Sequence, residues 1–192
     1  MCTTARRLTV LFRMRRLGAV ALMLLTASPV AAQTALSEYE IKAAFLFHFA
    51  QYVQWPPEAV PRESRSFELC VLGTDPFGAT LEETFAGKVV HGRPLAIRRI
   101  ARFDADGCQI LFVSSSESNR INEILRAIVG ASILTVGETA GFTAAGGIIN
   151  FRIQNDKLRF EINPEAAEGS GLKISSELLK LATIVHGEPA KP

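Results

Sequence analysis

The sequence predicts a single α/β domain of three layers, a Rossmann-like fold in which helices cover both faces of a mainly parallel sheet. Short apolar runs rich in strand-forming residues alternate with segments of helical periodicity, and this order implies right-handed crossovers between parallel strands. Late in the chain, two alternating runs are joined by Asn155-Asp156, which is a strong hairpin signal. The predicted sheet is therefore mixed, with an antiparallel hairpin near its C-terminal end.

Residues 1–32 are predicted to be a secretory signal peptide, which leaves 33–192 as the folded domain. Five arginines precede the apolar run LGAVALMLL and the small residues of ASPVAAQ. The apolar run is shorter than the ~20 residues that a membrane-spanning helix needs, and an uncleaved anchor is the alternative. No acidic residue leaves with the five arginines, so cleavage changes the formal net charge from +2 to −3. Nucleic acid is therefore a poor partner.

The first half of the domain reads as a helix followed by strands. Helical periodicity extends from Ser37 to Trp55 and is ended by Pro56-Pro57, and its regular polar positions predict a core helix without membrane insertion after signal cleavage. Asp75-Pro76 is a cap followed by a first-turn proline, which predicts a helix to about Ala86. Strands are predicted on either side of it, at FELCVLG (67–73) and RPLAIRRI (93–100).

The second half continues the alternation. A helix capped by Ser115 or Ser116 and ending near Val129 is predicted between two buried strands, QILFVS (109–114) and ASILTV (131–136). The hairpin comprises 146–154 and 157–163. Short helices are predicted after Asn163-Pro164 and from Ser175 or Ser176.

Cys70 and Cys108 are the cysteines that remain after signal cleavage. In an oxidising compartment an even pair is typical of a disulfide, and two separate buried thiols are the alternative. A bridge would close a loop of about 38 residues, worth about 3–4 kcal/mol in the chain-entropy model.

No pattern in the sequence predicts an enzyme, a cofactor site or a metal site. The LGTDPFG turn lacks the spacing of a dinucleotide or P-loop motif, and the three histidines are scattered. A group of arginines is the strongest charge feature, and it fits either an anionic ligand near that turn or a solvated strand edge. Its members are Arg93, Arg98, Arg99 and Arg102.

Several segments together resemble the periplasmic YfiR family over about residues 38–185. Their ordered set is specific, although each is weak alone: KAAFLFHFAQYVQWP, LCVLGTDPFG, GRPLAIRRI, CQILFVSSSE, ILTVGE, GGIINF, and RFEINPEAA leading to GLKISSELLKLA. The resemblance implies an exported, non-enzymatic regulator that represses an inner-membrane diguanylate cyclase, YfiN-like, and so controls cyclic-di-GMP and biofilm formation. It also implies a homodimer and an outer-membrane OmpA-like lipoprotein, YfiB-like, as a second partner.

The family pattern also bears on the cysteines. Cys70 and Cys108 match its positions in LCVLG and CQILF, whereas a second close cysteine pair, found in some members around GGIINF, is absent here. A periplasmic small-molecule sensor acting on another membrane receptor, such as a histidine kinase, is the alternative function.

Partner contacts are predicted on the hairpin and on the first helix. On the hairpin, Ile149, Phe151, Arg159 and Glu161 alternate along the strands, and the alternative is that the two apolar residues face the core. On the helix, Phe47 and Trp55 project from the polar side. They suit either a dimer or partner surface, or cover by the neighbouring PPEAVPRES loop.

Overall fold

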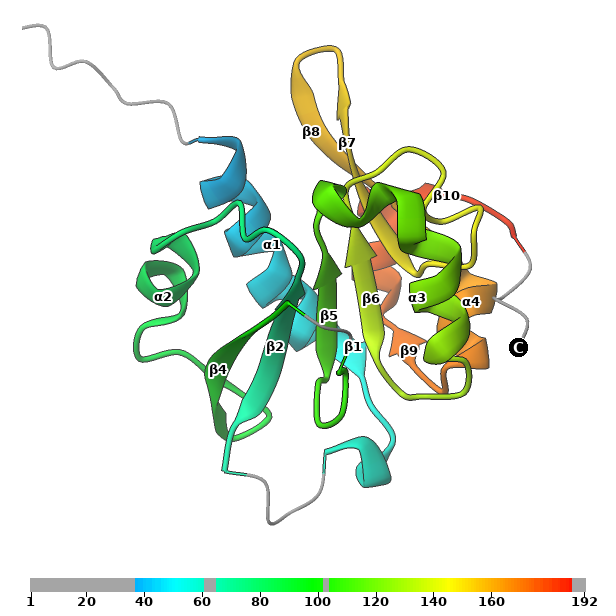
Figure 1. The fold of residues 1–192 in the computed structure, drawn as a ribbon. Helices are drawn as coiled ribbons and strands as arrows, with labels where there is room; N and C mark the ends of the chain where they lie inside the picture. Colours follow the sequence, from blue (N-terminus) through cyan, green and yellow to red (C-terminus); the bar gives the residue numbers. More distant parts are fainter. Residues whose placement is uncertain (1–36, 61–64, 102–103, 188–192) are drawn as a thin grey trace, which may run out of the picture. The chain divides into compact units, whose positions relative to one another are not determined.

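An eight-stranded sheet organises residues 37–60, 65–101 and 104–187, which are the residues that a computed structural model describes (Figure 1). The strand order is β10-β8-β7-β6-β5-β2-β4-β3. The central strands run parallel, whereas β7–β8 and β3–β4 pair antiparallel. The predicted mixed α/β fold with a C-terminal hairpin is therefore confirmed, and the predicted signal peptide lies outside the described residues.

The helices and strands have the following bounds. The strands are β1 Val53–Gln54, β2 Phe67–Leu72, β3 Val89–Val90, β4 Arg93–Ile100, β5 Ile110–Val113, β6 Leu134–Gly137, β7 Ile149–Gln154, β8 Lys157–Ile162, β9 Lys173–Ile174 and β10 Thr183–Ile184. The helices are α1 Glu38–Tyr52, α2 Thr80–Phe85, α3 Ile121–Ala127, α4 Pro164–Gly169 and α5 Ser176–Leu181, with 3₁₀ turns at Pro57–Ala59 and Ser115–Arg120. None of the helices in this part of the chain is long and apolar enough to cross a membrane.

Side chains of the parallel strands alternate between two buried clusters, one on each face of the sheet. On β2, Leu69 and Val71 join the cluster that contains Leu46 and Phe49 of α1. Cys70 and Leu72 join the opposite cluster, which contains side chains of α3. Because both faces are covered, strand β5 is apolar at all four positions, as a two-sided buried strand requires.

Helix α1 begins as predicted and ends earlier. Ser37 and Glu40 form a reciprocal capping box at its start. The predicted end at Trp55 is wrong, because Val53 and Gln54 leave the helix and pair antiparallel with β9. A second small sheet thus begins where the proline pair was expected to end the helix.

Two predicted helix starts are also corrected. Helix α2 begins at Thr80, because the Asp75 carboxylate accepts a hydrogen bond from the Phe77 N–H at 2.7 Å and so caps a turn instead of the helix. Ser114, rather than Ser115 or Ser116, caps the next helical segment, which opens with 3₁₀ geometry before α3. Asn163 and Ser175 cap α4 and α5 as the sequence predicts.

The β7–β8 hairpin has the tight turn that its sequence predicts. Asn155 and Asp156 adopt φ of 51° and 56°, the left-handed conformation that a type I′ turn needs at both central positions. Gln154 and Lys157 flank the turn and pair directly across it. The register of the whole hairpin is therefore fixed by these two residues.

The Phe142 ring packs directly against the backbone of Gly137 at the end of β6, where there is no side chain. A Cβ placed on Gly137 would lie 2.5 Å from the ring, closer than real contacts allow. The buried loop after β6 therefore depends on the absence of a side chain at position 137.

We expect Gly137→Ala to lower the free energy of unfolding by about 1–3 kcal/mol, because the ring has no free space into which to move. Urea unfolding of the Gly137→Ala, Phe142→Ala and double variants measures the effect. In the Phe142→Ala background, the added methyl group should cost little. An equal cost in both backgrounds would show that the ring is not the cause.

Candidate functional site

The β7–β8 hairpin projects beyond the sheet to which it belongs (Figure 1). On one side, β6 pairs with β7 only at Ile149 and Asn150. On the other side, β10 pairs with β8 only at Glu161 and Ile162. Within the described residues, the outer part of the hairpin, 151–160, therefore pairs only with itself.

The projecting ribbon has an apolar face and a basic face. At its base, Phe151 and Phe160 are buried against the aromatic side chains of α1. Further out on that face, Ile153 is 55% exposed and Leu158 is half-buried. The opposite face carries exposed polar and basic side chains: Arg152, Gln154, Lys157 and Arg159.

A groove of about 220 Å³ lies between the hairpin and the first turns of α1. Charged side chains of α1 and of the segment after β6 form one wall, and hairpin side chains form the other. The lining residues are Glu38, Lys42, Glu138, Ala140, Phe151, Arg152, Ile153 and Leu158.

A buried ion pair forms the charged wall of this groove. The Lys42 ammonium lies 2.7 Å from Glu138 and 2.5 Å from Glu38, and 4.5 Å from the centre of the Tyr39 ring. The side chains of Lys42 and Glu138 are 4% and 5% exposed. Glu138 also accepts hydrogen bonds from the Tyr39 hydroxyl and from the Ser115 N–H, so both charges have several partners.

These contacts fix the protonation states around the groove. Burial alone would lower the pKa of Lys42, but hydrogen bonds to Glu138 and Glu38 and the charge of Glu138 outweigh burial and raise it. Burial raises the pKa of Tyr39, and the Glu138 carboxylate raises it further. Near neutral pH Lys42 is therefore an ammonium that lines the groove, and Tyr39 beside it is a neutral phenol.

The structure places the four predicted hairpin contacts in different environments. Ile149 and Phe151 lie in the core, which is the alternative that the sequence left open. Glu161 is 7% exposed and is held by Arg152 and by the Thr143 hydroxyl, so it is not a free surface charge. Arg159 is exposed. A partner contact stays a prediction for all four, and in this conformation only Arg159 presents its side chain to solvent.

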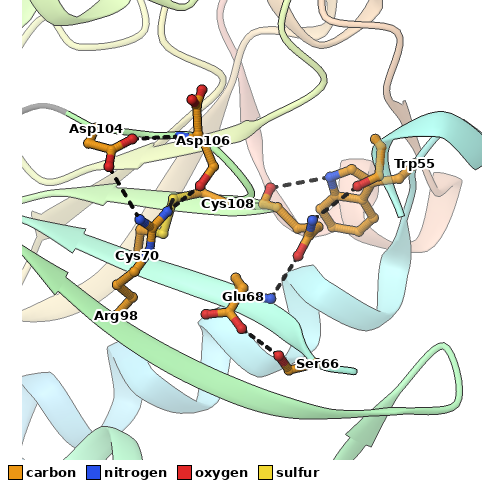
Figure 2. The surroundings of a disulfide bond; sticks show 10 residues. Trp55, Ser66, Glu68, Cys70, Arg98, Asp104, Asp106 and Cys108 are labelled. Atoms are coloured by element: carbon orange, nitrogen blue, oxygen red, sulfur yellow. Dashed lines mark hydrogen bonds and ion pairs between the residues drawn. A yellow bond between two sulfur atoms is a disulfide. The ribbon is translucent and has the colours of Figure 1, made fainter. Parts of the chain in front are cut away.

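Phe47 and Trp55 are both half-buried. The Phe47 ring lies beside Phe85 of α2 and beneath the Lys88 ammonium. Trp55 packs edge-on against Phe67 at 5.0 Å, and its indole N–H donates to the Gln109 carbonyl at 3.2 Å (Figure 2).

Part of the cover for these two rings therefore comes from α2 and β2. Residues 61–64 of the PPEAVPRES loop lie outside the described residues, so cover by that loop stays a prediction. Whether the exposed remainder of either ring contacts a partner stays a prediction.

Cys70 and Cys108 form a disulfide that joins β2 to the segment that leads into β5, two residues before that strand begins (Figure 2). The Cα atoms are 5.9 Å apart and 38 positions apart in sequence, and both residues are buried. The Arg98 guanidinium donates to the Cys108 sulfur at 3.1 Å and to the Asp106 carbonyl. The bridge thus fastens the amino end of β5 to its neighbour in the sheet, and the alternative of two separate thiols does not apply to this structure.

Three of the predicted arginines are engaged within the chain. Arg93 donates a hydrogen bond to the Val60 carbonyl at 3.5 Å. Arg99 contacts Asp75 and Glu82 at 2.6 Å each, and these carboxylates raise its pKa. Arg98 pairs with Asp104 at 3.7 Å. Arg102 lies outside the described residues. Because Asp75 belongs to the LGTDPFG turn, the turn brings its own carboxylate to Arg99, which weakens the case for an anion site there.

The Lys42–Glu138 pair is a feature that the sequence alone does not predict. Glu38 and Lys42 are four residues apart on a helix, and this spacing predicts an ion pair between them. Glu138, however, lies 96 positions from Lys42, and only the fold brings it there. Among the described residues, no group of three or more His, Cys, Asp or Glu side chains is placed to hold a metal ion.

Comparison with known proteins identifies the family of this chain and solved structures that are similar to it. A family model described as YfiR/HmsC-like matches residues 39–183. A crystal structure of a protein described as a conserved domain protein from Vibrio cholerae O1 biovar El Tor is similar, with a TM-score of 0.50 and 14% identity over 78% of this chain. The chain covers 60% of that protein's length, and at this identity the likeness concerns the fold alone.

We expect Lys42→Met to lower the free energy of unfolding by about 3–5 kcal/mol, because it leaves Glu138 buried without its cation. Urea unfolding measures the change. Lys180→Met, on the exposed side of α5, is the matched control and should alter stability by about 0.5 kcal/mol or less. Comparable losses in the two variants would contradict a structural role for the buried pair.

Proposed function

The chain belongs to the YfiR/HmsC-like family, and on this basis we propose that it is an exported, non-enzymatic regulator that represses an inner-membrane diguanylate cyclase. It binds the periplasmic domain of the cyclase, and cyclic-di-GMP synthesis and biofilm formation fall. The single observation that carries this proposal is the family match, which spans nearly the whole described domain, from the start of α1 to β10. The family is a regulatory, non-catalytic one.

The cellular location follows from the same proposal. Residues 1–32 direct export and are removed, and the Cys70–Cys108 disulfide suits an oxidising periplasm. The disulfide restricts the unfolded chain and so raises stability by about 3–4 kcal/mol. In this role it is a structural bond that keeps the regulator folded outside the cytoplasm.

Repression works by equilibrium binding. The regulator favours the inactive state of the cyclase because it binds that state more tightly than the active one. A shift from 1:99 to 99:1 in favour of the inactive state needs about a 10⁴-fold difference in affinity. A homodimer, and an OmpA-like lipoprotein that competes for the regulator, complete the proposed circuit.

The hairpin is the proposed contact surface. Its outer part projects from the sheet, carries the exposed side chain of Ile153 and is basic on one face. The small-molecule sensor is the weaker function, because Arg99 is already neutralised by Asp75 and Glu82 at the turn where a ligand was expected.

Deleting the gene in the source bacterium should raise cellular cyclic-di-GMP severalfold, measured by mass spectrometry of cell extracts. Expression of the full chain should restore the low level. Expression of residues 33–192 without the signal should not, because the protein would then stay in the cytoplasm. An unchanged cyclic-di-GMP level in the deletion strain would contradict the proposed function.

A further inference from the structure

The outer edge of β8 is paired with another strand along only part of its length. Strand β10 adds to β8 in parallel, but it pairs only with Glu161 and Ile162. Within the described residues, no strand pairs with this edge from Lys157 to Phe160. An unpaired edge presents backbone donors and acceptors that can hydrogen-bond to another chain.

Hairpin geometry shows which backbone groups face this edge. A two-residue loop places Gln154 and Lys157 in a hydrogen-bonded pair, and such pairs alternate with non-hydrogen-bonded ones along the ribbon. Ile153 and Leu158 form the next pair, so the N–H and C=O of Leu158 point away from β7. The same alternation turns Ile162 outward, and the Ile162 carbonyl indeed accepts from the Val185 N–H at 2.9 Å.

The side chains around this edge favour the binding of an acidic peptide segment. Lys157 and Arg159 are exposed, and in the described part of the chain neither forms an ion pair. The Arg159 guanidinium donates a long hydrogen bond, 3.5 Å, to the Leu158 carbonyl. Glu161, the nearest buried carboxylate on β8, is already held by Arg152 and Thr143. On the other face of the ribbon, Leu158 and Ile153 offer apolar contact.

The charges of this edge disfavour pairing with a second copy of this chain in the register centred on Leu158. If two β8 edges paired antiparallel about Leu158, Lys157 of one copy would face Arg159 of the other. Like charges directly opposite each other destabilise a strand pair. The charges that favour an acidic strand thus disfavour self-pairing.

We propose that the edge of β8 from Lys157 to Phe160 binds an extended acidic segment of the regulator's protein partner by strand addition. Leu158 supplies the outward backbone donor and acceptor, and Lys157 and Arg159 select acidic side chains. Apolar side chains of the added segment lie against Leu158 and Ile153. The inference rests on the proposed function for the identity of the partner, whereas the properties of the edge are testable without that partner.

The direct test uses a short blocked peptide of alternating glutamate and valine as the probe. Hydrogen exchange of the full mature protein, read residue by residue, should slow by roughly tenfold or more at the Leu158 and Phe160 amides when the peptide is added. A peptide of alternating lysine and valine should have no effect. Absence of protection at these two amides with the acidic peptide, or equal protection with both peptides, would overturn the proposal.

Variants at position 158 separate backbone recognition from side-chain contact. Leu158→Pro removes the outward N–H, whereas Leu158→Ala removes most of the side chain and keeps that donor. Peptide affinity should fall by about tenfold more for Leu158→Pro than for Leu158→Ala, as the loss of a well-placed hydrogen bond would give. Circular dichroism and thermal unfolding check that both variants are folded. Equal affinities of folded variants would exclude strand addition.

The same pair of variants tests the inference in cells. At matched periplasmic levels, Leu158→Ala should repress cyclic-di-GMP more strongly than Leu158→Pro. If both repress as fully as the unsubstituted protein, strand addition is wrong while the proposed function stands. If the unsubstituted protein itself leaves cyclic-di-GMP unchanged, the proposed function is wrong, and the peptide experiment alone decides on the edge.

Discussion

The buried ion pair between Lys42 and Glu138 sets the position of α1 on the sheet. Removing two charges from water costs several kcal/mol for each ion, and this cost is offset only when the geometry and the additional hydrogen bonds are good. Here Lys42 reaches two carboxylates and an aromatic face, and Glu138 accepts from a side-chain amine, a phenol and a backbone N–H. Because Glu138 follows β6 and Lys42 is on α1, a shift of the helix would break these contacts.

The position of α1 in turn supports the hairpin. Phe45 and Phe49 of α1 lie against Phe151 and Phe160 at the base of the ribbon, with ring centres 5.3–6.2 Å apart. The base is thus anchored in the core, whereas the outer part gains no support from neighbouring strands. Rigid attachment of a solvent-exposed ribbon lowers the entropy lost when a partner binds, because the ribbon is already extended.

How far the sequence predicts this arrangement depends on the range of the interactions. Strand β4 was predicted at its observed bounds, and the Asn155-Asp156 turn was recognised, because local alternation and turn chemistry decide both. The two-residue strands β1, β9 and β10 were not predicted, since each exists only through pairing with a distant segment. Lys42 illustrates the same limit: a lysine on a helix reads as exposed until a distant carboxylate is placed beside it.

The exposed edge of β8 creates a risk of association between copies, because open strand edges promote edge-to-edge pairing. Lys157 and Arg159 oppose this association, since antiparallel pairing of two β8 edges about Leu158 would place like charges opposite each other. A neutral edge would bind strands of many kinds, and a covered edge would bind none. Lys157 and Arg159, which form no ion pair with the described residues, therefore favour one class of ligand at this edge, a segment whose charge is opposite to that of the edge.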